Sequence, residues 1–123
     1  MYKLLHNPRC RKSREAMEFL KFKNLNFEIL LYIKDGLETN QLKEIIDKLD
    51  VNPIDLVRKQ EKIWKENYKS KKLSNNEIID LLHKYSNLIK RPIFISNNKA
   101  TIAIPPEEII KLFKLNYYMF SLS

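Results

Sequence analysis

Hydrophobic and polar positions follow two different periods along the chain, and their alternation predicts the order of the elements. An apolar run at residues 2–5 predicts a first strand, and the β-enriched run at residues 27–33 predicts a second. Between them, apolar positions recur at helical spacing from Cys10 to about Lys23, which predicts a helix. A strand, a helix and a strand joined by short loops form a βαβ unit with two parallel strands and a right-handed crossover.

Helical spacing dominates the middle of the chain. An amphipathic stripe over residues 42–49 predicts a helix with Thr39 as its cap. The pair Asn52-Pro53 predicts an N-cap followed by a proline in the first turn of a short helix. Ser74 and Glu77 predict a capping box that opens another helix.

After the helical middle, the period of two returns. Residues 92–96 and 101–104 predict a hairpin, and Pro105 opens a last helix. The resulting order is βαβ, a helical insert at about 37–86, and then ββα. This pattern matches the α/β sheet of a thioredoxin-like fold.

Length and composition favour one domain without cross-links. The chain has 123 residues, 44% of them hydrophobic, which is enough to build a core without metals or disulfides. Its lone cysteine cannot pair within the chain, and one cysteine with two distant histidines cannot supply a structural zinc site. We expect a single domain over residues 1–123, whose tail at 115–123 either covers an edge of the core or docks on a partner.

The net charge of +8 does not by itself predict a nucleic-acid partner, because the lysines are scattered along the chain. No apolar run approaches the roughly 20 residues that a membrane span needs, and the N-terminus lacks the pattern of a signal peptide. We therefore expect a cytoplasmic protein with no membrane partner.

The loop that contains Cys10 carries the candidate chemistry. We expect Cys10 where the first strand turns into the first helix, so that unpaired backbone amides and the helix dipole favour its thiolate. Four cations flank it and predict a pKa below the ordinary ~8.5 of a thiol: Arg9, Arg11, Lys12 and Arg14. The alternative is a small buried hydrophobe, which is how most free cysteines behave.

No second thiol follows Cys10, because Ser13 occupies the second cysteine position of a Cys-x-x-Cys motif. If Cys10 is a nucleophile, the second thiol comes from another molecule. His6 has two interpretations: it tunes the ionisation of Cys10, or it only closes the turn. These three residues are the candidate catalytic residues.

Arginine is used sparingly, five times among 23 basic residues. This suggests positions where a planar, bidentate donor matters, as it does for a tetrahedral oxyanion. Ordinary surface salt bridging is the alternative for each. The candidate oxyanion ligands are Arg11, Arg14, Arg58 and Arg91.

Over about residues 2–113 the chain resembles the glutaredoxin-linked arsenate reductase (ArsC) family. The resemblance implies a thioredoxin-like fold and reduction of arsenate or a similar oxyanion. It also implies glutathione as co-substrate, glutaredoxin as partner, and no bound cofactor or metal. Four anchors carry it, in this order: His6-Asn7-Pro8-x-Cys10-x-x-Ser13-Arg14, Leu56-Val57-Arg58-Lys59, Leu88-Ile89-x-Arg91-Pro92-Ile93, and Pro105-Pro106-Glu107.

For individual residues, the resemblance implies that Cys10 is the arsenate nucleophile and that His6 influences its ionisation. It implies that Arg58 and Arg91 bind the oxyanion and that Pro92 follows a cis peptide bond.

The chain departs from this family at one position of the candidate site. Reductases of the family usually carry a third arginine just before the Pro-Pro-Glu anchor, where this chain has Ile104. An isoleucine cannot donate to an arsenate oxygen. Either the site is weaker, or Lys99 or Arg11 compensates, or the substrate is not arsenate. Two other functions therefore stay open: a regulator related to the Spx proteins that bind RNA polymerase, and a glutathione-dependent thiol oxidoreductase that does not act on arsenate.

Overall fold

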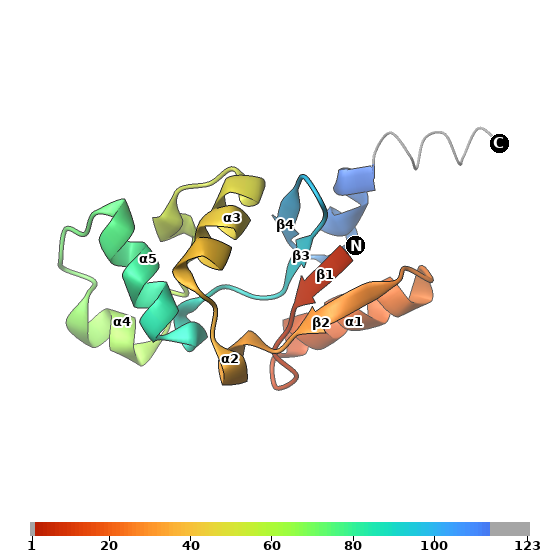
Figure 1. The fold of residues 1–123 in the computed structure, drawn as a ribbon. Helices are drawn as coiled ribbons and strands as arrows, with labels where there is room; N and C mark the ends of the chain where they lie inside the picture. The colour runs from red at the N-terminus through yellow and green to blue at the C-terminus, as the bar shows by residue number, and fades with distance from the viewer. Residues whose placement is uncertain (1, 114–123) are drawn as a thin grey trace. The chain divides into compact units, whose positions relative to one another are not determined.

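A computed structural model describes residues 2–113 of the chain (Figure 1). The elements are strands β1–β4, α-helices α1–α5 and 3₁₀ helices η1–η3. In chain order they are β1 (Tyr2–Leu5), α1 (Arg11–Phe22), β2 (Phe27–Leu30), α2 (Tyr32–Asp35), α3 (Thr39–Leu49), η1 (Pro53–Leu56), α4 (Lys62–Asn67), α5 (Asn75–Lys84), η2 (Ser86–Leu88), β3 (Ile93–Ile95), β4 (Ala100–Ile102) and η3 (Pro106–Phe113).

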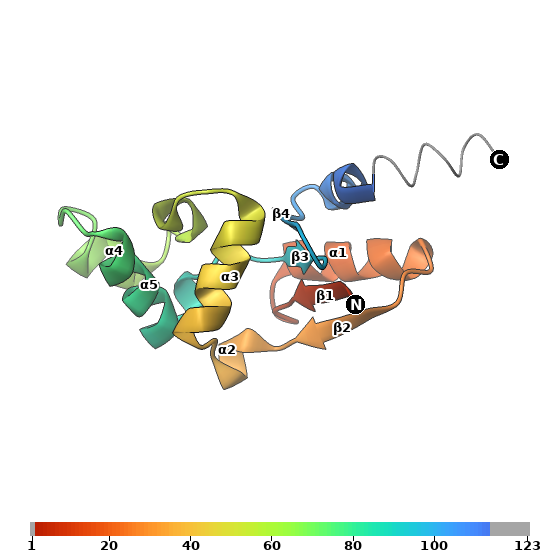
Figure 2. The same cartoon turned by 45° about the horizontal axis from the view of Figure 1, so that its top comes forward.

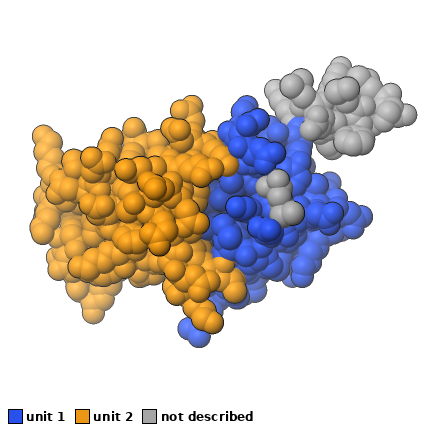
Figure 3. Space-filling view, in the orientation of Figure 1, with its two compact units in different colours: residues 1–30, 91–123 blue, residues 31–90 orange. Residues whose placement is uncertain are grey.

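The chain groups into two compact units (Figure 3). Unit 1 joins Met1–Leu30 to Arg91–Ser123 and holds the sheet, whereas unit 2 is the helical segment Leu31–Lys90. The helical insert expected at about 37–86 lies inside unit 2. The tail at 115–123 lies outside the described residues. Within the described residues, no helix is long and apolar enough to cross a membrane.

The sheet of unit 1 has four strands in the order β2-β1-β3-β4. Strand β1 pairs in parallel with β2, so the predicted βαβ unit is confirmed in its strand direction. It pairs antiparallel with β3, and β3 pairs antiparallel with β4, which confirms the predicted hairpin.

The core of unit 1 lies between the sheet, α1 and η3. Fully buried Leu4 and Phe94 from the sheet meet Ala16 and Leu20 of α1 and Ile109 of η3. Figure 2 shows α1 running along the sheet. Because this packing fixes α1 against β1, it also fixes the loop that joins them.

In unit 2, side chains cap the helices largely as predicted. The Glu77 amide donates to Ser74 Oγ at 3.2 Å and the Ser74 amide donates to Glu77 Oε1 at 3.0 Å, which confirms that capping box. Asn52 caps η1, with Pro53 in its first turn. The predicted cap of α3 was wrong by one residue: the N-cap is Glu38, whose amide donates to the Gln41 side chain at 2.8 Å.

The second strand is shorter than predicted, because it ends at Leu30 instead of residue 33. Tyr32 opens the short helix α2 instead. Its ring is buried, and its hydroxyl donates to the Ile89 carbonyl at 3.3 Å, within unit 2. The last predicted helix is present, but it is a 3₁₀ helix.

Candidate active site

Cys10 is the N-cap of α1, as the sequence predicted. Its amide donates to the Asn7 carbonyl at 2.9 Å, and its carbonyl accepts from the Arg14 amide at 3.1 Å. The side chain is partly exposed. Cys10 therefore combines a position at a helix N-terminus with access to solvent, and it is not the buried hydrophobe of the alternative interpretation.

Hydrogen bonds to two neighbouring polar residues fix the loop around the thiol. The Asn7 amide donates to Ser13 Oγ at 3.3 Å, and Asn7 Oδ1 accepts from the Arg9 amide at 3.1 Å. Ser13 is completely buried, so its hydroxyl ties the Asn7 backbone to the first turn of α1. Asn7 belongs to the His6-Asn7-Pro8 anchor of the sequence, and an asparagine before a proline favours such a turn.

The pKa of the Cys10 thiol is lowered, in the predicted direction. Partial burial is the largest single influence and raises this pKa. Hydrogen bonds from the backbone at Ser13 and Lys12, together with the hydrogen bond and positive charge of the Arg91 side chain, outweigh it. The thiolate is therefore favoured by the first turn of α1 and by an arginine from the second chain segment of unit 1.

The flanking cations are not the source of this shift, which corrects one of the two predicted causes; the other, the backbone amides at the start of α1, is confirmed. The Arg11 side chain is 84% exposed and pairs with Glu15 at 3.2 Å. Arg14 Nη1 donates to the Pro8 carbonyl at 2.9 Å. Neither of the two guanidinium groups contributes to the Cys10 shift, and Lys12 contributes only through its backbone. Oxyanion binding by Arg11 and Arg14 stays a prediction.

His6 lies directly after β1, and its side chain is only 4% exposed. Its amide donates to the Leu30 carbonyl at 3.0 Å, and Nδ1 is buried without a hydrogen-bond partner in the described part of the chain. Burial is the main cause of a pKa below the ordinary 6.5; Arg14 lowers it further, and a backbone hydrogen bond with Ser13 opposes the change. His6 is therefore neutral at pH 7. Its influence on Cys10 stays a prediction.

Arg91 lies two residues before β3, and the Arg91-Pro92 peptide bond is cis, as the resemblance implied. A second cis bond, which the sequence analysis did not predict, joins Ile104 to Pro105. The Ile104 side chain is 42% exposed, and its amide donates to the Ile102 carbonyl at 3.0 Å. The structure thus places Cys10, His6, Ser13, Arg91 and Pro92 together in unit 1.

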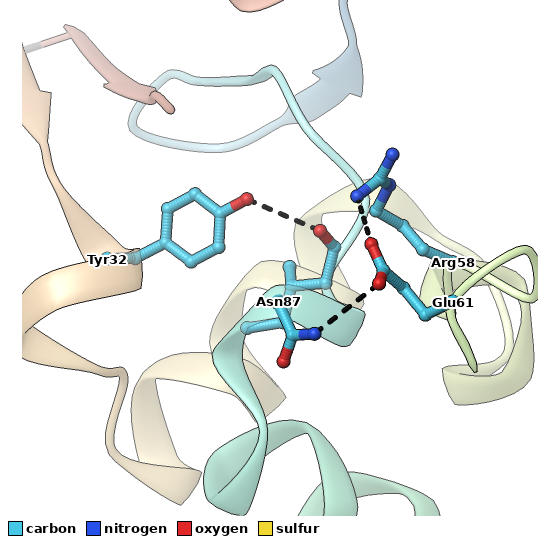
Figure 4. Close-up of polar contacts among 5 residues, drawn as sticks. Tyr32, Arg58, Glu61 and Asn87 are labelled. Atoms are coloured by element: carbon cyan, nitrogen blue, oxygen red, sulfur yellow. Dashed lines mark hydrogen bonds and ion pairs between the residues drawn. The ribbon is translucent and has the colours of Figure 1, made fainter. Parts of the chain in front are cut away.

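Arg58 belongs to unit 2, directly before a turn (Figure 4). Its amide donates to the Leu88 carbonyl at 2.7 Å, and Nη1 forms an ion pair of 2.6 Å with Glu61 Oε1. Glu61 also accepts from Asn87 Nδ2 at 3.5 Å. Glu61 was not predicted as a partner from the sequence, although its i,i+3 spacing from Arg58 is a signal for such a pair. Among residues 2–113, no other hydrogen bond or ion pair uses this guanidinium.

These residues supply a stabilised thiolate and guanidinium groups, which suit nucleophilic attack on an anion. No group of histidine, cysteine and acidic side chains suited to a metal ion occurs within the described residues. The ArsC family model matches residues 5–112. The chain belongs to the ArsC family.

The relatives that match this chain span nearly its whole length. The chain is 33% identical over 111 residues to the arsenate reductase of Haemophilus influenzae, covering 89% of this chain and 96% of that protein. It is 34% identical over 112 residues to Escherichia coli YfgD, an uncharacterized protein, covering 89% of this chain and 94% of that protein.

Solved structures assign the fold. An arsenate reductase from Vibrio cholerae superposes with a TM-score of 0.85 at 28% identity, covering 89% of this chain and 95% of that one. A putative arsenate reductase from Yersinia pestis gives a TM-score of 0.84, also at 28% identity, covering 90% of this chain and 99% of that one. The thioredoxin-like fold expected for this ArsC family chain is confirmed.

Proposed function

We propose that this chain is an arsenate reductase with Cys10 as its single nucleophile and with glutathione and glutaredoxin as external reductants. The observation that carries the proposal is the Cys10 thiol at the N-terminus of α1, with its pKa lowered by backbone amides and by Arg91. The thiolate is the reactive form, so a lowered pKa keeps it available near neutral pH. Arsenate reductases among its relatives support the substrate class.

The first step joins two negatively charged groups. The Cys10 thiolate attacks arsenic, an S–As bond forms, and one arsenate oxygen leaves as water after taking up protons. Arg91 and the amides of Lys12 and Ser13 offset the charge that gathers at this point. Arg58 is proposed as a second oxyanion ligand on the strength of the family resemblance and of its remaining donor groups.

The second step transfers two electrons. The thiolate of glutathione attacks the Cys10 sulfur, an S–S bond forms, and the S–As bond breaks. Its electron pair stays on arsenic, which leaves as arsenite. Glutaredoxin then reduces the disulfide between Cys10 and glutathione and restores the thiol. An external thiol is needed because Ser13 replaces the second cysteine.

The test is arsenate-dependent turnover by the intact chain with glutathione and glutaredoxin. We expect Cys10→Ser to abolish it and Arg9→Gln, which changes an exposed arginine outside the proposed site, to leave it unchanged. Turnover by Cys10→Ser would refute the nucleophile. Turnover with thioredoxin but not with glutaredoxin would refute the proposed reductant.

Ile104 favours a second candidate, a glutathione-dependent thiol oxidoreductase that does not act on arsenate. At this position the chain lacks the donor that the family resemblance implies for an oxyanion. Comparing turnover on a glutathionylated peptide with turnover on arsenate separates the two. Reduction of the peptide with no arsenate activity would establish the second candidate.

A further inference from the structure

A pocket of about 520 Å³ opens in unit 2, and unit 2 residues alone form it. Its walls combine positive charge with apolar surface, and no acidic residue lines it. The residues that matter here are Lys59, Lys69, Lys71, Lys72, Trp64 and Leu73.

Backbone hydrogen bonds fix two of these lysines beside the pocket. After α4, the Lys69 amide donates to the Trp64 carbonyl at 2.9 Å, and the Lys71 amide donates to the Tyr68 carbonyl at 3.0 Å. Lys71 Nζ lies 5.4 Å from the centroid of the Tyr68 ring. The turn therefore holds the lysine-bearing segment in place, although the side chains themselves are exposed.

Trp64 forms part of the apolar wall of the pocket and is held in place by packing. Its side chain is only 6% exposed, and its ring stacks on Tyr68 with centroids 6.3 Å apart. Buried Ile78 of α5 lines the same pocket. The pocket thus has a packed floor with cations at its rim.

The four pocket lysines are not paired with acidic side chains in the described residues. Glu61 pairs with Arg58 at 2.6 Å, and Glu66 pairs with Lys62 at 3.8 Å. Across residues 2–113, none of the four pocket lysines forms an ion pair. Like charges gathered without a counter-ion produce a local positive potential that attracts anions.

We propose that this pocket binds a small polyanion that carries two or more linked phosphate groups. Its volume lies within the range of small-molecule sites, roughly 300–1,000 Å³. Lysine ammonium groups bind phosphate as point charges without a fixed geometry, which suits an open rim. Several lysines around one cavity favour linked anionic groups over a single one. The pocket is independent of the chemistry proposed at Cys10.

The test uses the intact chain and the fluorescence of Trp64, the single tryptophan of the sequence. We expect a saturable change on titration with sodium tripolyphosphate, and none with sodium chloride at matched ionic strength. The double variant Lys69→Gln/Lys72→Gln should weaken binding about tenfold, because each exposed charge pair contributes up to about fivefold.

A matched control removes the same charge elsewhere in unit 2. Lys43→Gln/Lys65→Gln changes two exposed lysines that do not line the pocket, and its affinity should stay within about twofold of the parent. Circular dichroism verifies that both variants fold. Equal losses in the two variants would overturn the proposal, since they would show binding to overall charge.

Three further outcomes would also overturn the proposal. The first is equal affinity for inorganic phosphate and tripolyphosphate. The second is a response to an oligoglutamate peptide without any response to tripolyphosphate. The third is loss of tripolyphosphate binding in Cys10→Ser, which would place the anion at the loop of unit 1. Retained binding in Cys10→Ser supports the pocket whether or not the chain reduces arsenate.

Discussion

Arg91 and Arg9 offer a direct comparison of an arginine that touches the thiol with one that is only near it in sequence. Arg91 forms a hydrogen bond with Cys10 and adds a positive charge, whereas Arg9 is exposed and does not contribute to the Cys10 shift. Charge next to a thiolate stabilises it only where the group is close and partly shielded from water.

We therefore expect Arg91→Gln to raise the pKa of Cys10 and to slow its alkylation at neutral pH, because the thiolate loses a donor and a counter-charge. Arg9→Gln removes the same charge and should leave this pKa where it is. The pH dependence of Cys10 alkylation measures both. An equal rise in the two variants would mean that the charge of the whole loop sets the pKa.

Ile104 is the single side chain at which the candidate site departs from the family pattern. One charge-assisted hydrogen bond is worth about 1.5–3 kcal/mol. Ile104→Arg should therefore lower the arsenate concentration that half-protects Cys10 from alkylation by about tenfold or more. Ile104→Met keeps the volume without the charge and should change nothing. Protection that is the same in both variants would show that position 104 does not reach the anion.

Among single elements, α5 depends on the capping box at its start. Ser74→Ala removes the acceptor of the Glu77 amide and should lower the free energy of unfolding by about 1 kcal/mol. Ser70→Ala is a suitable control, because Ser70 is exposed and makes no hydrogen bond within residues 2–113. Urea titration measures both. If Ser70→Ala costs as much stability as Ser74→Ala, the cap does not explain the effect.

Local patterns predicted the elements whose stability depends on local contacts. The capping box at Ser74 and the helix start at Asn52-Pro53 each involve residues within one turn of the chain, and both are present. The end of β2 depends instead on Tyr32, whose hydroxyl reaches Ile89 across unit 2. Periodicity within residues 27–33 contains no information about that distant partner.

The same distinction applies to the candidate site. The position of Cys10 at a helix start followed from local spacing and is confirmed. Of the two predicted causes of its lowered pKa, the backbone amides at the start of α1 are confirmed. The flanking cations were wrong, because composition counts the cations that are near in sequence, whereas Arg91 reaches Cys10 through the pairing of β1 with β3. Only the family resemblance pointed to Arg91 and to the cis bond before Pro92.

At the scale of the whole molecule, unit 1 is assembled from the two ends of the described chain, and the helical segment between them forms unit 2. The sheet therefore brings the N-terminus of α1, in the first third of the chain, together with Arg91, in the last third. Arg58 and the lysine-lined pocket both lie in unit 2.

The two perturbed groups of unit 1 also make the stability of the fold depend on pH in one direction. The pKa of His6 is lowered from 6.5, so the unfolded chain binds more protons than the native one as pH falls below that value. The pKa of Cys10 is lowered from that of an ordinary thiol, so the unfolded thiol is still protonated where the native one is already ionised. In both windows the unfolded state binds more protons, and stability rises with pH.

We therefore expect urea midpoints to fall as pH drops below 6.5 and to rise again as pH increases from the native pKa of Cys10 to the pKa of the unfolded thiol. Cys10→Ser lacks the titrating thiol, so its midpoints should lose the upper rise and keep the fall below 6.5. A Cys10→Ser protein that retains the upper rise would show that another group titrates there, and the ionised thiol would then not be the native state that arsenate meets.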